Sequence, residues 1–396
     1  MANILFLCGS DPWTQASGYF LYSVRCVEML ARTQGVCAAS LYRPQPDRLV
    51  PPPNIKRVWL AERRLDSRVQ RMRSLFGGAS FCEREFNYPG VRDWVKGMFD
   101  REKPDLVVFN HIRAAWLAPL LGQLGVPTLY IAHNAEGMSY ASIAQLESNP
   151  AGKLFALLEG RKLHRLEKRI LDTVDSVIAL TEEDRDRLQI LRPGLPMHVV
   201  PPCFDVPTGR APAGPGNGVI LIVGSFHWRP KRTNVIWFLR HVYQPLRKLR
   251  PGLRCLIVGA NANALRPAIA AGDGVELHAD VPSVEPYLSQ PAIFVTPERQ
   301  WGGVKLKTCE AAAYGHPIVS TTPGMEGTGL RNGESCLVAN TAEELQAAVV
   351  RCLDDHPFAE ELGRRARLVA QDRFSYRNVS DNLNAAINAA LSAKTA

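Results

Sequence analysis

Residues 292–320 have the sequence AIFVTPERQWGGVKLKTCEAAAYGHPIVS, and this stretch decides the fold of the chain. It begins with an apolar run at 292–296, passes through a loop of Pro and Gly residues, and becomes a helical pattern at 305–314. A second apolar run, 317–320, follows the helix almost at once. Strand, helix and strand in this order predict a parallel sheet that is covered by helices on both faces.

The same alternation of short apolar runs and helical patterns recurs along the rest of the chain. In the first half we expect strands at 4–8, 36–42, 56–60, 105–109, 128–132, 176–180 and 198–201. In the second half we expect strands at 219–223, 253–258, 275–277, 292–296 and 317–320. Helices are expected between them, among others at 114–124, 233–249, 341–353 and 375–391. This pattern predicts an α/β protein with doubly wound parallel sheets.

The length of 396 residues favours two domains at about 150 residues per domain. Residues 206–217 are rich in Pro, Gly and Ala, which is typical of a linker. We therefore expect one Rossmann-like domain at 1–205, a second at 218–374, and a C-terminal helix at 375–396 that returns toward the first domain. Because ligands bind at the carboxyl ends of such strands, two domains that face each other would form a cleft.

The composition indicates a globular protein with anionic partners. The chain has 46% hydrophobic residues, and its 47 Lys and Arg against 38 Asp and Glu give a net charge of +9. This balance suits nucleotides, phosphates, acidic lipids or nucleic acid. No long apolar run predicts a membrane span, and no basic N-terminal segment indicates a signal peptide. Nine scattered cysteines favour reduced thiols and a cytoplasmic location, without a disulfide framework or zinc site.

The loop before the predicted helix at 305–314 is the richest candidate site. The backbone N–H groups of Gly303, Val304 and Lys305 should be free at this helix N-terminus, where unpaired donors and the helix dipole attract phosphate. Lys305 and Lys307 add positive charge, and Glu310 follows within the helix. From these residues alone, a plain strand–loop–helix with surface lysines is an equally good interpretation.

A second candidate site follows the strand at 219–223. The segment VGSFHWRPKRTN, residues 223–234, places Arg229, Lys231 and Arg232 at the start of a predicted helix. Cations at a helix N-terminus oppose the helix dipole, so a bound anion would compensate them. A solvated basic loop is the alternative interpretation.

The second half of the chain resembles the C-terminal domain of GT-B glycosyltransferases of the group 1, family 4 type. It is most similar to the branch associated with bacterial exopolysaccharide clusters. The residues that carry this resemblance are VGSFHWRPKRTNVIWFL, GGVKLKTCEAAAYGHPIVSTTPGMEG and NGESCLVANTAEELQAAV, in this order. The first half agrees in layout, with Gly18 after the first strand and a turn at His133-Asn134-Ala135-Glu136 after a later one.

The resemblance implies a donor site in the second half. Arg229 and Lys231 would hold the donor diphosphate, and Ser225 replaces a family arginine. Glu310 matches the family glutamate that binds the donor ribose, and Lys307 is a further phosphate cation.

The same resemblance places the remaining site residues. Gly302 stands where the family has a glutamate that contacts the donor sugar, and it begins the loop that continues through Gly303, Val304 and Lys305. Val281 takes the nucleobase-contacting position. His133 would lie near the reacting centre, with Gly18 and Glu136 on the acceptor side. The residues implied in catalysis are His133, Glu310 and Lys231.

The resemblance implies a cytoplasmic enzyme that moves a sugar from a nucleotide-sugar donor to a glycan or lipid-linked acceptor, with retention and in bacterial surface polysaccharide synthesis. Neither a metal, another cofactor nor nucleic acid is expected. A nucleotide-sugar 2-epimerase of the same fold is an alternative, but it needs carboxylates for elimination that are not evident here. A non-catalytic nucleotide- or glycan-binding relative is a third, because Gly302 and Ser225 depart from the family pattern.

The sequence Asp184–Arg185–Asp186 has the DxD form of some metal sites. Thr181, three residues before Asp184, fits a helix N-cap, so we expect a charged helix and no bound metal here.

Two basic stretches have open interpretations. Residues 161–170, RKLHRLEKRI, have Leu163, Leu166 and Ile170 on one helical face and cations around the rest. This is typical of a solvated helix face, and it also suits an anionic membrane surface or a lipid-phosphate acceptor. The second stretch, with the same two interpretations, contains Arg63, Arg64, Arg68, Arg71 and Arg73. A membrane role would place the protein at the inner face of the cell membrane.

Overall fold

The computed structural model describes residues 1–14, 18–43, 49–62, 67–121, 125–147, 149–204, 214–215, 218–270 and 272–392. The chain divides into an N-terminal unit, Met1–Cys203 with Arg377–Ala396, and a C-terminal unit, Phe204–Tyr376. Most of the predicted linker, 206–217, lies outside the described residues, as do Arg63, Arg64 and the side chain of Arg68.

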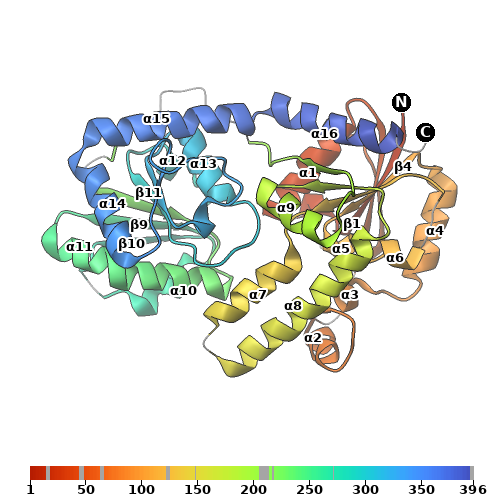
Figure 1. The fold of residues 1–396 in the computed structure, drawn as a ribbon, viewed down its shortest axis with the longest axis horizontal. Coiled ribbons are helices and arrows are strands. Elements are labelled where there is room, and N and C mark those ends of the chain that lie inside the picture. The colour runs from red at the N-terminus through yellow and green to blue at the C-terminus, as the bar shows by residue number, and fades with distance from the viewer. Residues whose placement is uncertain are drawn as a thin grey trace. The chain divides into compact units, whose positions relative to one another are not determined.

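The N-terminal unit is built on a seven-stranded parallel sheet (Figure 1). Its strands are β1 (Asn3–Ser10), β2 (Gly35–Tyr42), β3 (Lys56–Ala61), β4 (Leu106–Asn110), β5 (Thr128–Ala132), β6 (Ser176–Ala179) and β7 (Met197–Val199). They are ordered β3-β2-β1-β4-β5-β6-β7. The strand order reverses between β1 and β4, which is the switch point where doubly wound sheets bind ligands.

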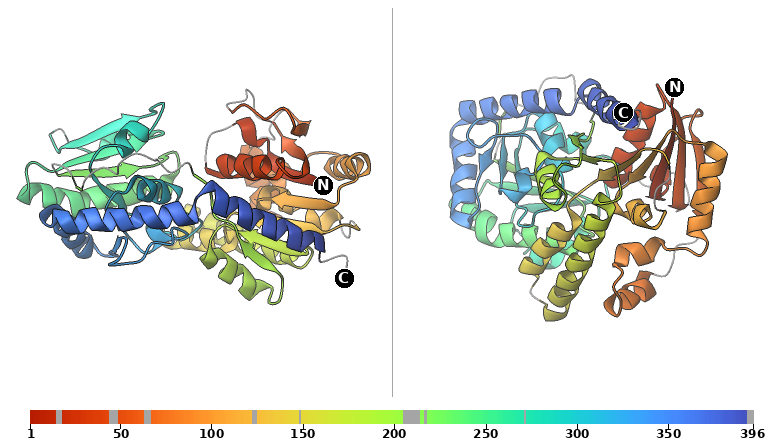
Figure 2. Two further views of the ribbon diagram at one scale, coloured as in Figure 1. Left: turned by 90° about the horizontal axis from the view of Figure 1, so that it is seen from above. Right: turned by 45° about the vertical axis from the view of Figure 1, so that its right-hand side comes forward.

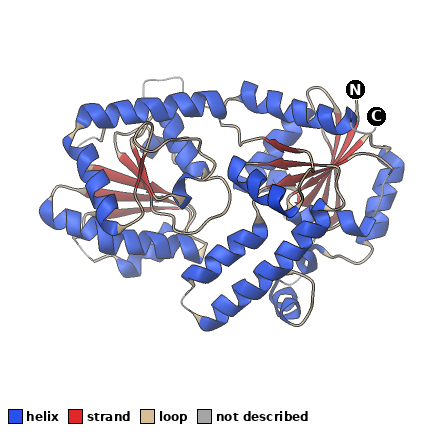
Figure 3. Ribbon diagram, viewed as in Figure 1, coloured by secondary structure: helices blue, strands red, loops and turns tan. Residues whose placement is uncertain are grey.

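Helices lie on both faces of this sheet (Figure 3). The α-helices of this unit are α1 (Gly18–Leu30), α2 (Ser67–Leu75), α3 (Phe81–Phe86), α4 (Val91–Glu102), α5 (Ile112–Ala115), α6 (Ala118–Leu121), α7 (Glu136–Leu146), α8 (Pro150–Leu171), α9 (Glu182–Leu191) and α16 (Tyr376–Ser392). A short 3-10 helix, η1 (Pro12–Thr14), precedes α1. Helix α16 belongs to this unit although it ends the described chain, as the two views of Figure 2 also show.

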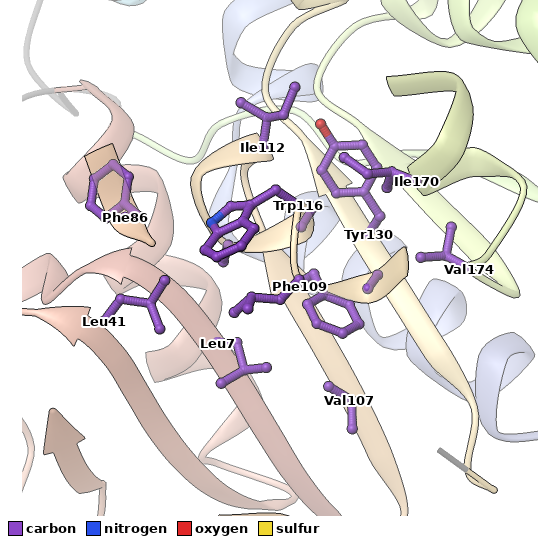
Figure 4. Close-up of a cluster of buried hydrophobic side chains, with 14 of the residues drawn as sticks. Leu7, Leu41, Phe86, Val107, Phe109, Ile112, Trp116, Tyr130, Ile170 and Val174 are labelled. Carbon is purple, nitrogen blue, oxygen red and sulfur yellow. The ribbon is translucent and has the colours of Figure 1, made fainter. Parts of the chain in front are cut away.

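The core of the N-terminal unit fills the space between the strands and their covering helices. Trp116 and Phe109 lie at its centre with Tyr130 nearby, and all three are buried (Figure 4). The strands are buried on both faces, which explains why they are continuous apolar runs in the sequence.

The C-terminal unit repeats this plan with six parallel strands. They are β8 (Val219–Val223), β9 (Arg254–Gly259), β10 (Val275–Ala279), β11 (Ile293–Thr296), β12 (Ile318–Ser320) and β13 (Leu337–Val338), in the order β10-β9-β8-β11-β12-β13. Its helices are α10 (Arg229–Phe238), α11 (Gln244–Leu249), α12 (Glu285–Leu288), α13 (Leu306–Tyr314), α14 (Ala342–Asp354) and α15 (His356–Arg373). The switch point lies between β8 and β11. The predicted α/β class, with a doubly wound sheet in each half, is confirmed.

Two predicted helices are interrupted where a proline removes a backbone donor. The described part of the helix expected at 114–124 is two short helices, α5 and α6, because Pro119 has no N–H to donate to Ala115, and residues 122–124 lie outside the described residues. The helix expected at 233–249 contains a π-helical turn, Leu239–Tyr243, just before Pro245. Pro245 cannot donate to the carbonyl of His241, which accepts a 2.8 Å hydrogen bond from Gln346 Nε2 instead.

Helix α15 is present in the structure but was not predicted from the sequence. Its buried positions are mostly small: Ala359, Gly363, Ala366 and Ala370. Gly363 is required because a Cβ there would lie 2.2 Å from the carbonyl oxygen of Gly315. Small residues give a weak hydrophobic pattern, so the sequence did not reveal this helix. Within the described part of the chain, no helix combines the length and apolar content needed to cross a membrane.

Candidate functional site

Two loops follow the switch-point strands of the C-terminal unit. The loop 224–228 leads from β8 into α10, and the loop 297–305 leads from β11 into α13. The end of β9 lies against the first loop, because a Cβ on Gly259 would be 2.0 Å from the carbonyl oxygen of Gly224. Arg232 also fixes this loop: its Nη1 donates to the carbonyls of Phe226 at 2.6 Å and His227 at 2.8 Å.

Lys231 connects the two loops. Its Nζ lies 3.6 Å from Oε1 of Glu298, which follows β11. Asn234 Nδ2 donates to Glu298 Oε2 at 3.1 Å and to Gln300 Oε1 at 2.7 Å, and both amides are buried. Gln300 Nε2 donates to the same Glu298 oxygen at 2.9 Å. Two neutral amides therefore orient one carboxylate beside the lysine.

Three other predicted donor residues lie near these loops or on the neighbouring strand end. Ser225 is exposed in the loop 224–228, and Arg229 is exposed at the start of α10. Val281 follows β10 and is half-buried against the hydrophobic core on the α13 side of the sheet.

A buried carboxylate holds the glycine loop in place. Glu326 Oε2 accepts the backbone N–H of Gly302 at 2.8 Å and lies 3.7 Å from Lys305 Nζ. Lys305 Nζ also donates to the carbonyl of Gly302 at 2.7 Å. Gly302 and Gly303 have φ angles of 134° and 65°, which side chains with a Cβ rarely adopt.

At the start of α13, one of the three amides that were predicted to be free is hydrogen-bonded. Lys305 is the N-cap residue, and its N–H donates to the Glu326 carbonyl at 3.2 Å, so the prediction that this amide is free is wrong. The amides of Gly303 and Val304 have no hydrogen-bond partner within the described residues. Two donors thus remain for an anion rather than three.

Lys307 and Glu310 lie one helical turn apart on α13. Lys307 Nζ donates to Glu310 Oε2 at 2.6 Å, and both side chains are partly exposed. The glutamate is therefore held beside the helix start and remains accessible to a ligand. Such an exposed pair costs little to open, because surface ion pairs are worth about 0–1 kcal/mol.

In the N-terminal unit, His133 lies at the carboxyl end of β5. Its Nε2 is 2.9 Å from Oδ1 of Asn110, which ends the neighbouring strand β4. Burial and, to a smaller extent, the charge of Arg113 lower the pKa of His133 to about 3. The imidazole is therefore neutral. Gly18 begins α1, and the ring of the next residue, Tyr19, lies 5.0 Å from the His133 ring.

His111 completes this cluster. Its ring lies 5.0 Å from that of His133, and its Nε2 is 3.4 Å from Oε1 of Glu136. The backbone of His111 has φ of 67°, a strained conformation for a residue with a Cβ. Burial holds the pKa of His111 well below its usual value, and burial raises that of Glu136.

Two buried carboxylates fix the start of α7, where Glu136 lies. Glu167 accepts the backbone N–H of Glu136 at 2.5 Å and that of Gly137 at 3.0 Å. Asp184 accepts the N–H of Ala135 at 3.1 Å. Burial raises the pKa of Glu167 to about 8.

The structure shows different surroundings for the two carboxylates of the DxD sequence, Asp184 and Asp186. Thr181 caps α9 by accepting the N–H of Asp184 at 2.9 Å, as predicted. Asp184 is fully buried and bound to the α7 start, whereas the side chain of Asp186 is 66% exposed and paired with Arg185. The two carboxylates therefore serve different elements. Within the described ranges, no three His, Cys, Asp or Glu side chains gather in a way that could hold a metal ion.

Sequence reasoning missed several site residues: Tyr19, Asn110, His111, Glu298 and Glu326. A signal existed for His111, because it follows the strand at 105–109 as His133 follows the strand at 128–132. Neighbouring parallel strands end at the same edge of a sheet, so both histidines belong there. Glu298 and Glu326 carried no local signal.

Two family models match the chain. The model described as "Glycosyl transferase 4-like domain" matches residues 24–203. The model described as "Glycosyl transferases group 1" matches residues 217–355. The first lies within the N-terminal unit, and the second includes both switch-point loops of the C-terminal unit.

Solved structures share this architecture. Sucrose-phosphate synthase from Thermosynechococcus elongatus is similar over 99% of this chain and 100% of its own, with a TM-score of 0.76 and 17% identity. Anabaena HepE in complex with UDP-glucose is similar over 98% of this chain and 100% of its own, with a TM-score of 0.67 and 13% identity. At these identities the likeness shows the fold, and it confirms the predicted GT-B class.

A curated relative is an uncharacterized 44.6 kDa protein in the cps region of Klebsiella pneumoniae, 26% identical over 216 residues. The match covers 52% of this chain and 55% of the relative, so the chain spans about half the length of that protein. The two family models together account for most of this chain, one on each unit. The chain therefore belongs to the group 1 glycosyltransferases, with an N-terminal domain of the glycosyltransferase 4-like type.

Proposed function

We propose that the chain transfers a sugar from a nucleotide-sugar donor to a hydroxyl group of a glycan or lipid-linked acceptor, with retention of anomeric configuration. The observation that carries this proposal is the start of α13. There the amides of Gly303 and Val304, which have no partner among the described residues, lie beside Lys305 and Lys307, with Glu310 one turn further on. A diphosphate suits the amides and cations, and a carboxylate can accept from two ribose hydroxyls.

The donor is a nucleoside diphosphate sugar on two grounds. HepE, a structural neighbour, binds UDP-glucose. In this chain, Arg229 and Lys231 begin α10 on the other side of the switch point, so cations flank the place where a diphosphate would lie. Val281 would contact the base.

In the proposed reaction, the bond between the anomeric carbon and the diphosphate oxygen breaks, and negative charge grows on the diphosphate. Lys231, Lys307 and the two amides stabilise this charge. The acceptor hydroxyl attacks from the face that the leaving group vacates, and its proton passes to a phosphate oxygen of the departing diphosphate. A new glycosidic bond and a free nucleoside diphosphate result.

The N-terminal unit would supply the acceptor side. His133, neutral because it is buried, would contact the donor sugar at the reacting centre. Gly18, which precedes Tyr19 of this cluster, and Glu136, which contacts His111, would bind the acceptor. The relative in a cps region supports a role in bacterial surface polysaccharide synthesis. The reaction would take place at the cytoplasmic side of the membrane.

Nucleotide release with and without acceptor tests this function. A transferase releases nucleoside diphosphate only when a suitable acceptor is present, and the transferred sugar keeps its anomeric configuration. An epimerase of the same fold would convert the donor sugar without acceptor, and a binding protein would do neither. A screen of donors by thermal shift selects the nucleotide sugar first, since a bound ligand raises the melting temperature.

A further inference from the structure

An exposed surface of the N-terminal unit combines cations with apolar side chains. We define the α2–α8 face by Met72, Leu75 and Phe76 at the end of α2, and by Leu154, Arg161 and Arg165 on α8. Phe76 is 88% exposed, Met72 63% and Leu154 58%. Single exposed apolar residues are ordinary on protein surfaces, but a group of them on neighbouring helices indicates an interaction site.

The two helices of this face are packed together. Lys162 Nζ of α8 donates to the carbonyl of Ser74 in α2. The Arg71 guanidinium lies 5.4 Å from the Phe81 ring centre and 5.6 Å from that of Phe155, which is on α8. Figure 1 shows α2 beside the middle of α8. Helices α2 and α8, which are far apart in the sequence, therefore lie side by side.

The outward side of α8 has no negative charge. Its two acidic residues, Glu159 and Glu167, are buried, and each accepts a backbone N–H from another element. Leu154, Arg161 and Arg165 recur at helical spacing and are all exposed. The helix thus turns its carboxylates inward and exposes leucine and arginine, which is the reverse of a simple solvated face.

We propose that the α2–α8 face binds the surface of an anionic lipid bilayer. Charge complementarity selects this occupant, because cations on the face attract acidic headgroups while Met72, Leu75 and Phe76 enter the boundary with the acyl chains. An acidic glycan would engage the arginines but would leave the apolar side chains in water. A second copy of the chain would bring two like-charged faces together, which is unfavourable.

The test measures sedimentation of the full chain with vesicles of phosphatidylcholine alone or rich in phosphatidylglycerol, without donor or acceptor. Because no reaction is involved, failure here is distinguishable from failure of the proposed glycosyl transfer. The wild-type chain should bind only the acidic vesicles. This binding should weaken as salt rises, since screening acts over about 8–10 Å at ordinary ionic strength.

Paired variants separate the two contributions. Arg161→Gln with Arg165→Gln should weaken binding about 25-fold, at about fivefold per cation near the surface. Met72→Ser with Phe76→Ser should weaken it about tenfold or more, because apolar burial is lost. Matched controls on the C-terminal unit are Arg331→Gln with Arg364→Gln, and Leu249→Ser with Leu368→Ser, all at exposed positions. Their binding should equal that of the wild type.

Several outcomes would overturn the proposal. These are binding to neither vesicle, equal binding to both, or controls that lose as much as the face variants. Light scattering adds another: if Met72→Ser with Phe76→Ser dissolved an oligomer and left vesicle binding unchanged, the face would be a contact between copies. Unchanged melting of the variants, expected at exposed positions, ensures that lost binding reflects the surface.

Discussion

The carboxylate of Glu310 has two candidate partners, Lys307 on the same helix and the ribose of a bound donor. In the structure its Oε2 accepts from Lys307 at 2.6 Å, and a donor would bring ribose hydroxyls to the same carboxylate. Glu310→Gln keeps the volume and removes the charge. Because a hydrogen bond to a charged group is worth about 1.5–3 kcal/mol, donor affinity should fall about tenfold to a hundredfold. Calorimetric titration with the donor measures this loss.

The matched control for that experiment is Glu334→Gln, which removes a carboxylate from another exposed pair, with Arg331. Both variants should melt near the wild-type temperature, because exposed ion pairs contribute little to stability. Normal donor binding by a well-folded Glu310→Gln would contradict the donor-site assignment of the α13 start.

The buried His133 should make the free energy of unfolding depend on pH. Burial keeps its pKa at about 3 in the folded chain against 6.5 when exposed, so only the unfolded state gains this proton as pH falls below 6.5. Stability from this residue is present above pH 6.5 and is lost toward pH 3, at about 1.4 kcal/mol per pH unit. His133→Gln removes this dependence. Between pH 6.5 and about 5, the wild-type free energy of unfolding should therefore fall about 2 kcal/mol further than that of the variant.

Urea unfolding at a series of pH values measures the difference. His227→Gln, at an exposed position in the C-terminal unit, controls for the loss of a histidine as such. Equal pH slopes for wild type and His133→Gln would mean that burial does not keep this imidazole neutral.

At the scale of elements, the loop 297–305 depends on a carboxylate from the next strand–helix connection. Glu326 binds the N–H of Gly302 and lies 3.7 Å from the mostly buried Lys305 ammonium. Glu326→Gln keeps an acceptor but removes the charge that this lysine faces. Breaking a buried pair costs about 3–5 kcal/mol, so the C-terminal unit should unfold at lower denaturant concentration.

Glu326→Gln should also weaken donor binding, because the loop 297–305 sets the orientation of the Gly303 and Val304 amides. Comparison with Glu344→Gln separates the effects, since Glu344 caps α14 by accepting the N–H of Asn340 and Thr341. That control should lower stability modestly and leave donor affinity unchanged. If Glu326→Gln retained full stability and full donor binding, the loop would be held by other contacts.

At the scale of the whole molecule, the reaction should not need a divalent metal. The negative charge of the diphosphate would be met by Arg229, Lys231 and Lys307 together with two amides, so a metal ion would have little charge left to neutralise. Activity measured as nucleoside diphosphate release should persist in excess EDTA. Loss of activity in EDTA with recovery on adding Mg²⁺ or Mn²⁺ would refute metal independence.

The sequence by itself determined most of the strands, many of the helices and the class of the fold. Apolar runs buried on both faces become parallel strands wherever helices alternate with them, and β8 matches its predicted bounds, 219–223. The phosphate loop was visible because glycines, lysines and a helix start adjoin in one stretch, 302–310. The interruption of helices at Pro119 and Pro245 was also present in the sequence, as a missing backbone donor, and was overlooked.

The tertiary structure alone decided which side chains meet. Glu326 reaches Gly302 across 24 residues because β11 and β12 are neighbours in the sheet, and Lys231 reaches Glu298 because β8 and β11 are neighbours. His111 and His133 form one cluster because β4 pairs with β5. Local hydrophobic spacing records how each segment folds and which face it buries. It does not record the order of the strands, and strand order sets the contacts between residues that are distant in the chain.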